Sequence, residues 1–195
     1  MAQIYVINKF QGNPYPNAIE VDTTSGGPFK DLSPFYLGPI VDPHTGENCL
    51  NFENYWQYSK VYLDQWDFDK PTPGYWEWRK QGFNNNRAIR YPKGKGAKPF
   101  GSLFGNEILD YITARKRIYA PFYAGLVACT YSYTLLYKWL IIDNRDVVLR
   151  DYDGYDYTSL NMSLIEVINN PKRKMGHAFI LAGMLTGMFE GMIKE

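Results

Sequence analysis

The stretch Asn51-Phe52-Glu53-Asn54-Tyr55-Trp56-Gln57-Tyr58-Ser59-Lys60 decides how the middle of the chain folds. Asn51 suits the N-cap of a helix, because its side chain accepts a hydrogen bond from an otherwise unpaired amide of the first turn. The pattern predicts a helix that runs from Asn51 to about Trp66, and Pro71 and Pro73 mark its end.

Polar residues form one narrow stripe on this predicted helix. At about 100° per residue, the stripe spans a sector of about 60° and consists of Glu53, Gln57, Lys60 and Asp64. Most of the remaining circumference is apolar, whereas a surface helix has a wide polar face, so we expect the stripe to line a cleft. A solvated edge with weak surface pairing fits the same spacing. In a partly dry cleft, Lys60 beside a carboxylate is a candidate nucleophile or acid/base.

Length and composition bound the class of protein. The chain has 195 residues, of which 45% are hydrophobic, and this is enough for one soluble domain to bury a core. The formal net charge is +1, so any affinity for phosphate must come from a local cluster. Aromatic residues make up 17% of the chain, which suits walls for planar ligands and an ordinary core alike.

Several features predict a cytoplasmic protein without a membrane partner. Cys49 and Cys129 are too few for a disulfide framework and lack CxxC spacing. The first residues lack the basic start, long apolar stretch and small-residue cleavage site of a signal peptide, so we expect none. The longest apolar stretch, from His177 to Met188, is well short of the roughly 20 residues that a membrane span needs.

Hydrophobic patterning predicts an α+β fold that is mostly helical and forms a single domain. We expect short strands at Gln3–Ile7 and Ile19–Val21, near the N-terminus, and at Asp146–Asp151. Further helices are expected from about Glu107 with a kink or end at Pro121, over Tyr123–Leu140, near Ser163 and near Met175.

A basic segment, residues 79–98, follows the predicted helix. It contains no acidic residue and seven basic ones, which are Arg79, Lys80, Arg87, Arg90, Lys93, Lys95 and Lys98. Gly94 and Gly96 can expose backbone amides to a diphosphate that arginines hold bidentately. A merely solvated loop fits the same composition, and the order of residues is not that of a Walker loop. Arg90 and Lys98 are candidate substrate-binding residues.

The acidic loop Asp151-Tyr152-Asp153-Gly154-Tyr155-Asp156 follows a predicted strand, a common place for site residues. It does not fit an EF-hand, because its Gly comes too early and Met162 stands where the closing Glu is needed. Asp151 and Asp153 can hydrogen-bond ribose hydroxyls, or they can be ordinary turn aspartates. We take Asp151 as a candidate substrate-binding residue and Asp153 as a candidate catalytic carboxylate.

The sequence predicts neither a metal site nor a cofactor. His44 and His177 have no metal-ligand spacing between them. His177 opens a predicted helix, where it is either structural or packed near a ligand as a substrate-binding residue. No Gly-x-Ser-x-Gly elbow occurs and neither cysteine has an adjacent His, so serine or cysteine hydrolase chemistry is not predicted.

Two motifs of the chain resemble the NADAR superfamily, which includes YbiA-like N-glycosidases. Leu32-Ser33-Pro34-Phe35-Tyr36 is similar to its Leu-Ser-x-Phe-Tyr segment, and Asn51–Lys60 is similar to its helix Ser-Val-Glu-x-x-Tyr-Gln-x-x-Lys. Further segments with some likeness are Ala97–Gly101, Ala114–Lys116 and Gly176–Ala178, so the resemblance covers roughly residues 28–190. The family's Trp-Gly pair and its Asn near Gly176 are absent, and residues 65–91 look like an insertion. These departures indicate a divergent branch.

The resemblance implies cleavage of the N-glycosidic bond of a ribosyl or ADP-ribosyl conjugate, with ADP-ribosylated guanine in DNA among the candidate substrates. It implies that Lys60 is the key catalytic residue and attacks the anomeric carbon without a metal. Glu53 would handle protons and stabilise positive charge on the sugar. At the matching positions we expect substrate contacts from Phe35, Tyr36, Trp56 and Gln57.

Two other hypotheses stay open. The domain can be a non-catalytic module that binds a nucleotide or ADP-ribose, or the basic segment can contact DNA that carries a modified base. The sequence alone does not distinguish a free nucleotide partner from a DNA partner, and it does not give the oligomeric state.

Overall fold

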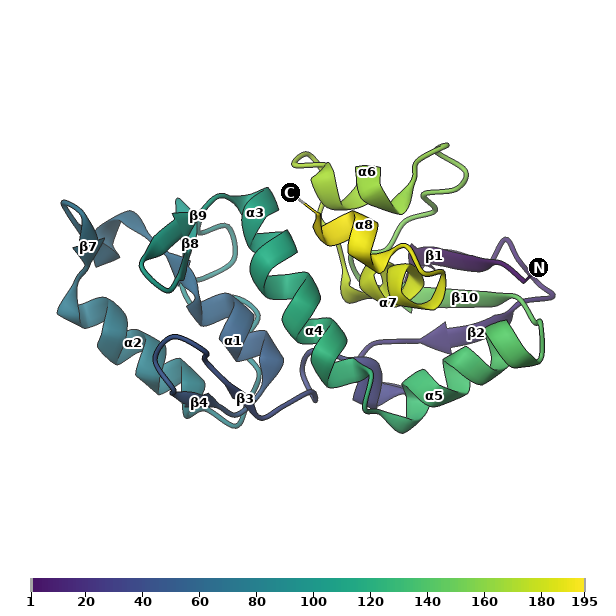
Figure 1. Ribbon diagram of the computed structural model, residues 1–195, viewed down its shortest axis with the longest axis horizontal. Helices are drawn as coiled ribbons and strands as arrows, with labels where there is room; N and C mark the ends of the chain where they lie inside the picture. The colour runs from purple at the N-terminus through teal and green to yellow at the C-terminus, as the bar shows by residue number, and fades with distance from the viewer. Residues whose placement is uncertain (1, 195) are drawn as a thin grey trace. The chain divides into compact units, whose positions relative to one another are not determined.

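The computed structural model describes residues 2–194 and confirms the mixed α+β class. Its residues cluster into two compact units (Figure 1). Unit 1 comprises Met1–Ser33 and Ala120–Glu195, and unit 2 comprises Pro34–Tyr119. The candidate residues of the helical stripe belong to unit 2, whereas those of the acidic loop belong to unit 1.

Unit 1 is built on a parallel sheet of three strands in the order β1-β10-β2. The strands are β1 (Ile4–Asn8), β10 (Val147–Asp151) and β2 (Ile19–Asp22), and Leu149 of the central strand aligns with Val6 and Val21. These three side chains are fully buried, as expected for a parallel sheet that is covered by other elements. The strands predicted near the N-terminus and around residues 146–151 are therefore confirmed.

Helix α7 (His177–Leu185) is the central helix of unit 1 and is buried along nearly its whole length. It packs against β1 and β10 and against α4 (Ala120–Val127), α6 (Leu164–Asn169) and α8 (Phe189–Ile193). Helix α6 begins after a capping box made by Ser163 and Glu166. This confirms the helix predicted near Ser163. The remaining helical segments of this unit are η1 (Lys30–Leu32), α5 (Tyr131–Tyr137) and the π-helical η4 (Lys138–Ile142).

Unit 2 packs helix α1 (Phe52–Tyr58) against α2 (Pro73–Phe83). Every residue of α1 is buried. Gly82 of α2 allows this close approach, because a Cβ at that position would collide with the ring of Tyr58. The predicted cap is confirmed, since the Asn51 side chain accepts a hydrogen bond from the Asn54 amide at 2.9 Å.

Short antiparallel strands complete unit 2. Strands β5 (Lys60–Val61), β8 (Gly101–Phe104) and β9 (Glu107–Leu109) form a sheet in the order β5-β8-β9. Two hairpins pair β3 (Ile40–Val41) with β4 (Asn48–Cys49) and β6 (Trp66–Asp67) with β7 (Lys70–Pro71). The unit also contains η2 (Leu63–Gln65), α3 (Tyr111–Ala114) and the π-helical η3 (Arg115–Tyr119).

The prediction that the first helix continues to Trp66 is wrong. The helix ends at Tyr58, and Lys60 and Val61 instead pair with Ser102 and Gly101 of β8. The Leu103 amide also donates to the Ser59 carbonyl at 2.7 Å. Pairing with a strand some forty residues away in sequence therefore overrides the helical periodicity. Local sequence does not reveal this pairing.

Three other helix boundaries differ from the predictions. Glu107 lies in β9, and the following helix starts only after Asp110, whose side chain accepts from the amides of its first turn. Pro121 is the second residue of α4 and does not end it. The helix predicted over residues 123–140 is interrupted at residues 128–130, because Thr130 caps a new helix, α5.

Helix α2 was not predicted, because Pro71 and Pro73 were interpreted only as stop signals. Pro73 occupies the first turn of α2, where its missing amide costs nothing, and Thr72 caps it by accepting from the Tyr75 amide. Among residues 2–194, no helix has both the length and the apolar character needed to cross a bilayer. The single-domain boundaries and the insertion at residues 65–91 stay predictions.

Candidate functional site

The predicted stripe becomes a hydrogen-bonded chain of three side chains in unit 2, here called the Glu53–Gln57–Lys60 relay. The Gln57 amide nitrogen donates to Glu53 Oε1 at 2.9 Å, and the Lys60 ammonium donates to Gln57 Oε1 at 2.7 Å. Glu53 and Gln57 are 6% and 7% exposed, whereas Lys60 is half-buried. One amide therefore fixes a buried carboxylate and a more accessible amine at its two ends.

The relay joins two kinds of secondary structure. Glu53 and Gln57 are one helical turn apart on α1, and Lys60 is the first residue of β5. Lys60 therefore contacts Gln57 of α1 although Lys60 itself lies outside the helix. Asp64 does not continue the stripe, because it lies in η2, is exposed and forms an ion pair with Lys93 at 2.6 Å.

Aromatic rings surround the amine end of the relay. The Lys60 ammonium lies 5.0 Å from the centroid of the Trp56 ring, within the range of a cation–π attraction. The Tyr119 ring packs against Trp56 at 5.1 Å and against Phe52 at 5.3 Å between centroids. The predicted substrate contact Trp56 is therefore next to Lys60, and Tyr119 is a neighbour that sequence patterns did not indicate.

The two motifs of the NADAR resemblance meet at the first turn of α1. The Glu53 amide donates to the Pro34 carbonyl at 3.0 Å, and the Phe52 amide donates to the Leu37 carbonyl at 2.8 Å. Between these anchors lie Phe35, which is half-buried, and Tyr36, which is 54% exposed. Their segment is therefore fixed beside Glu53, and substrate contact by either ring stays a prediction.

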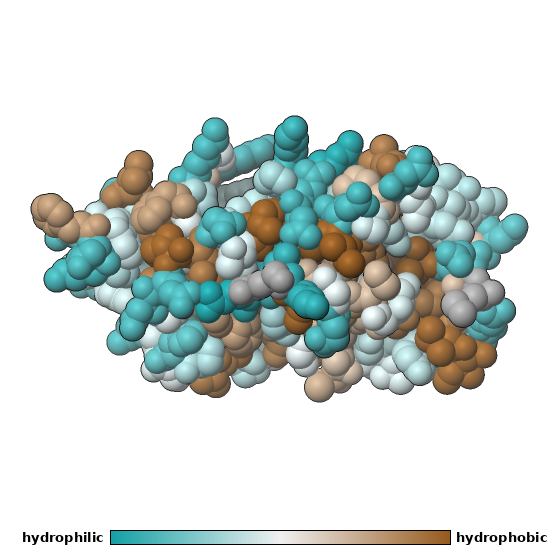
Figure 2. Space-filling view, turned by 45° about the horizontal axis from the view of Figure 1, so that its top comes forward, coloured by the Kyte–Doolittle hydropathy of each residue, from teal (hydrophilic) through white to brown (hydrophobic). Residues whose placement is uncertain are grey.

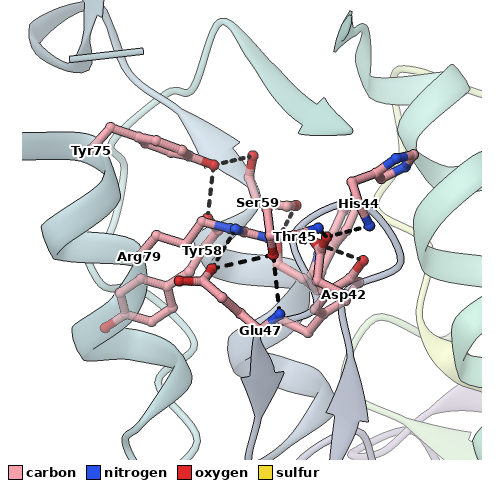
Figure 3. A network of polar contacts seen from close by, with 10 residues as sticks. Asp42, His44, Thr45, Glu47, Tyr58, Ser59, Tyr75 and Arg79 are labelled. Carbon is pink, nitrogen blue, oxygen red and sulfur yellow. Dashed lines mark hydrogen bonds and ion pairs between the residues drawn. The ribbon is translucent and has the colours of Figure 1, made fainter. Parts of the chain in front are cut away.

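An ionic network built on a buried pair of Asp42 and Arg79 holds the frame around α1 (Figure 3). Asp42 Oδ2 pairs with the Arg79 guanidinium at 2.5 Å, and Arg79 also pairs with Glu47 at 2.9 Å. Burial acts to raise the pKa of Asp42, but hydrogen bonds from Thr45 and the charge of Arg79 outweigh it, so the pKa is lowered. Arg79 is consequently a structural residue and does not belong to the exposed part of the predicted basic segment.

A further hydrogen bond ties α2 to α1, and burial of Cys49 excludes a thiol nucleophile in this part of unit 2. The Tyr75 hydroxyl of α2 donates to the Tyr58 carbonyl at 3.2 Å, at the end of α1 (Figure 3). Cys49 is fully buried, and burial raises the pKa of its thiol to about 12. The thiol is therefore protonated at neutral pH and unsuited to nucleophilic attack.

Asn54, the neighbour of Glu53, connects α1 to the basic segment and was missed by sequence analysis. Its amide nitrogen donates to the carbonyls of Gly82, Asn85 and Arg87, each at 3.0 Å. Its Oδ1 accepts from the Ile89 amide at 2.8 Å. A polar Asn outside the stripe of Glu53 and Gln57, on a helix whose other residues are aromatic, was the available signal for this role.

The candidates Arg90 and Lys98 lie in the irregular segment that Asn54 holds. The Arg90 guanidinium lies over the Tyr91 ring at 5.5 Å, and Lys98 is exposed. Figure 2 shows hydrophilic residues interspersed with apolar ones on the face that it draws. Binding of substrate by Arg90 or Lys98 stays a prediction.

Asp151 of the acidic loop contacts the first residues of α7 in unit 1. Asp151 is buried, and its Oδ2 accepts from the Ala178 amide at 3.1 Å and lies 3.1 Å from His177 Nδ1. The other ring nitrogen of His177 lies 2.9 Å from the Thr23 carbonyl. A side chain at Gly176 would collide with the Asp151 carboxylate. Asp151 therefore stabilises the start of α7, as a carboxylate does at a helix N-terminus.

The remaining candidate, Asp153, follows in the same loop and is half-buried, with its amide donating to Asp151 Oδ1 at 3.1 Å. Its catalytic role and the substrate-binding roles of Asp151 and His177 stay predictions. Among residues 2–194, no group of three or more His, Cys, Asp or Glu side chains has a metal-binding arrangement.

These observations define a mixed α+β protein with a buried carboxylate, a buried amide and a half-buried amine in series on one helix and the adjoining strand. The chain belongs to a family of unknown function (DUF6939), whose family model matches residues 6–180. That range contains every candidate site residue. Comparison with curated proteins and comparison with solved structures each found no match.

Proposed function

We propose that the protein is an N-glycosidase-like hydrolase, a divergent relative of the NADAR superfamily, which acts on a ribosyl or ADP-ribosyl conjugate. The Glu53–Gln57–Lys60 relay carries this proposal, because it places an amine and a buried carboxylate at fixed positions in an aromatic environment. Burial of Glu53 and Gln57 limits competition by water for their hydrogen bonds, which supports a preorganised site.

Lys60 is the nucleophile in the proposed reaction. The Lys60 ammonium first gives one proton to solvent. The neutral amine then forms a bond to the anomeric carbon while the bond from that carbon to the base nitrogen breaks, and the electron pair of the broken bond moves to the base. The proton lost by the amine is transferred to the departing base through Glu53. Opening of the sugar ring gives an imine between Lys60 and the sugar. Water then adds to the imine, releases the sugar and restores the amine.

Gln57 is a positioning residue in this scheme. Its amide cannot act as an acid or base at neutral pH, but its two hydrogen bonds orient Lys60 and Glu53 relative to each other. The substrate-facing rings are Trp56 and, from the neighbouring segment, Phe35 and Tyr36. A cytoplasmic location is part of the proposal and is supported by the two free cysteines, Cys49 and Cys129.

The decisive experiment measures base release from two substrates, an oligonucleotide with ADP-ribosylated guanine and a ribosylamino-pyrimidine. Wild type is compared with Lys60→Ala and with Lys70→Ala, a control that removes an exposed lysine from β7 of the same unit. We expect turnover by wild type and Lys70→Ala and none by Lys60→Ala. Equal turnover by Lys60→Ala would refute the catalytic assignment.

A binding module without chemistry is the second candidate function, favoured by the exposed basic residues beside α1. If wild type binds ADP-ribose but releases base from neither substrate, this alternative replaces the hydrolase. Borohydride reduction during turnover tests the imine separately. Absence of a trapped Lys60 adduct in an active preparation would assign Lys60 an electrostatic or acid/base role instead.

A further inference from the structure

The residues Arg87–Phe100, here called the basic loop, form an unusually charged part of the surface of unit 2. The loop has no acidic residue, and its basic residues are Arg87, Arg90, Lys93, Lys95 and Lys98. Lys93 is paired with Asp64. Within residues 2–194, the side chains of Arg87, Lys95 and Lys98 form no ion pair and are exposed. Several unpaired positive charges in a short segment favour a polyanionic partner.

The two ends of the basic loop are fixed to the two elements that carry the relay, α1 and β5. At its start, Asn54 of α1 binds the Arg87 carbonyl at 3.0 Å and the Ile89 amide at 2.8 Å. At its end, the Phe100 amide donates to the Val61 carbonyl at 3.0 Å. Asn54 adjoins Glu53 in sequence, and Val61 adjoins Lys60. The loop is therefore anchored at both ends to the two elements that carry the relay.

The backbone of the loop turns at Gly94 and Gly96, in a conformation that favours glycine. Gly94 and Gly96 have φ angles of +92° and +98°, and the space where a side chain would begin is open at both. The Gly94 amide donates to the Tyr91 carbonyl at 3.0 Å. Lys95 is exposed between these two glycines, which suits close approach of a phosphate backbone.

Aromatic rings lie near each end of the loop. Tyr91 and Phe100 are each 41% exposed, so both offer ring surface to solvent. The Arg90 guanidinium covers Tyr91 at 5.5 Å, and the Trp66 ring supports Phe100 edge-on at 5.6 Å between centroids. Exposed rings that neighbouring side chains hold in place are suitable platforms for stacking unpaired bases.

We propose that the basic loop binds single-stranded nucleic acid. Arg87, Lys95 and Lys98 neutralise backbone phosphates, and Tyr91 and Phe100 stack on bases. The number of cations favours a strand over a free nucleotide, because a single diphosphate has too few charges to engage cations spread over the loop. The consequence that the hydrolysed base belongs to a strand rests on the proposed function, whereas binding of the strand does not.

The test measures binding of a fluorescent, unmodified single-stranded DNA of about 16 nucleotides by anisotropy over a range of salt concentrations. Affinity should fall as salt rises, with a slope of about −0.7 for each phosphate neutralised on a logarithmic plot. The triple variant Arg87→Gln/Lys95→Gln/Lys98→Gln should therefore reduce the magnitude of the slope by about 2.

A matched control removes three exposed charges from unit 1 through Arg145→Gln/Lys172→Gln/Lys174→Gln. This control should bind DNA as wild type does. An equal loss of slope in both triple variants would show that binding follows net charge, and would overturn the assignment to the loop. Absence of DNA binding by wild type at low salt would overturn it as well.

The aromatic part of the proposal is tested by Tyr91→Ala, with Tyr91→Phe as the variant that keeps a stacking ring. We expect about a tenfold loss of affinity with Ala and near wild-type affinity with Phe. Equal binding by both variants would refute stacking at Tyr91. If the loop variants instead lose affinity for free ADP-ribose and keep affinity for DNA, the loop is a diphosphate site and the proposal is wrong.

Failure of this inference is distinguishable from failure of the proposed function. Lys60→Ala should bind the DNA strand as wild type does, because Lys60 is not part of the basic loop. Strand binding without base release by wild type would count against the hydrolase alone. Base release from free conjugates without strand binding would count against the loop alone.

Discussion

Replacing Gln57 with Leu is the most informative perturbation of the relay. Leu has a similar volume but removes both side-chain hydrogen bonds, to Glu53 at 2.9 Å and from Lys60 at 2.7 Å. The half-buried Lys60 can recover its partner from water, so its loss should be small. Glu53 is 6% exposed and loses a donor where water has little access. Leaving a buried acceptor short of a partner costs about 1–3 kcal/mol, and this should dominate the decrease in the free energy of unfolding.

The measurement is urea denaturation followed by tryptophan fluorescence, for wild type, Gln57→Leu, Glu53→Gln and the double variant. If the two side chains interact as the structure describes, their effects should not add, and the coupling should be about 1 kcal/mol. Effects that add to within about 0.5 kcal/mol would refute the reasoning. In an active preparation, Gln57→Leu should also lower kcat, and Gln57→Glu tests whether a carboxylate can replace the amide as a partner of Lys60.

Other predictions concern the frame of the site. Asp42→Asn should destabilise the protein by about 3–5 kcal/mol in thermal or urea unfolding, because it leaves the buried Arg79 without its closest carboxylate. Since folding lowers the pKa of Asp42, its contribution is complete above the ordinary value of 3.8 and is lost as the pH falls below it, so a pH series should show a weaker acid dependence for the variant. Gly82→Ala should cost about 1–3 kcal/mol, because the new Cβ collides with the ring of Tyr58. Gly74→Ala on the same helix, where the nearest atom would lie 3.7 Å away, should be close to neutral, and equal losses would contradict the packing argument.

The sequence determined those features that depend on neighbouring residues. The cap at Asn51, the capping box at Ser163 and the strands of unit 1 follow from local hydrogen-bonding chemistry and short hydrophobic patterns. The spacing of Glu53 and Gln57 was also sufficient to place them on one helical face, because both lie within the helix that forms.

Only the tertiary structure decided where that helix ends and what surrounds it. Val61 leaves the helical pattern because it pairs with Gly101, and this contact joins segments that are distant in sequence. Long-range contacts also include the buried ion pair between Arg79 and Asp42 and the anchoring of the basic loop by Asn54. Lys60 consequently reaches Gln57 from a strand rather than from the helix on which its spacing had placed it. Local patterns fix local geometry, whereas strand pairing and ionic partners depend on which distant segments the fold brings into contact.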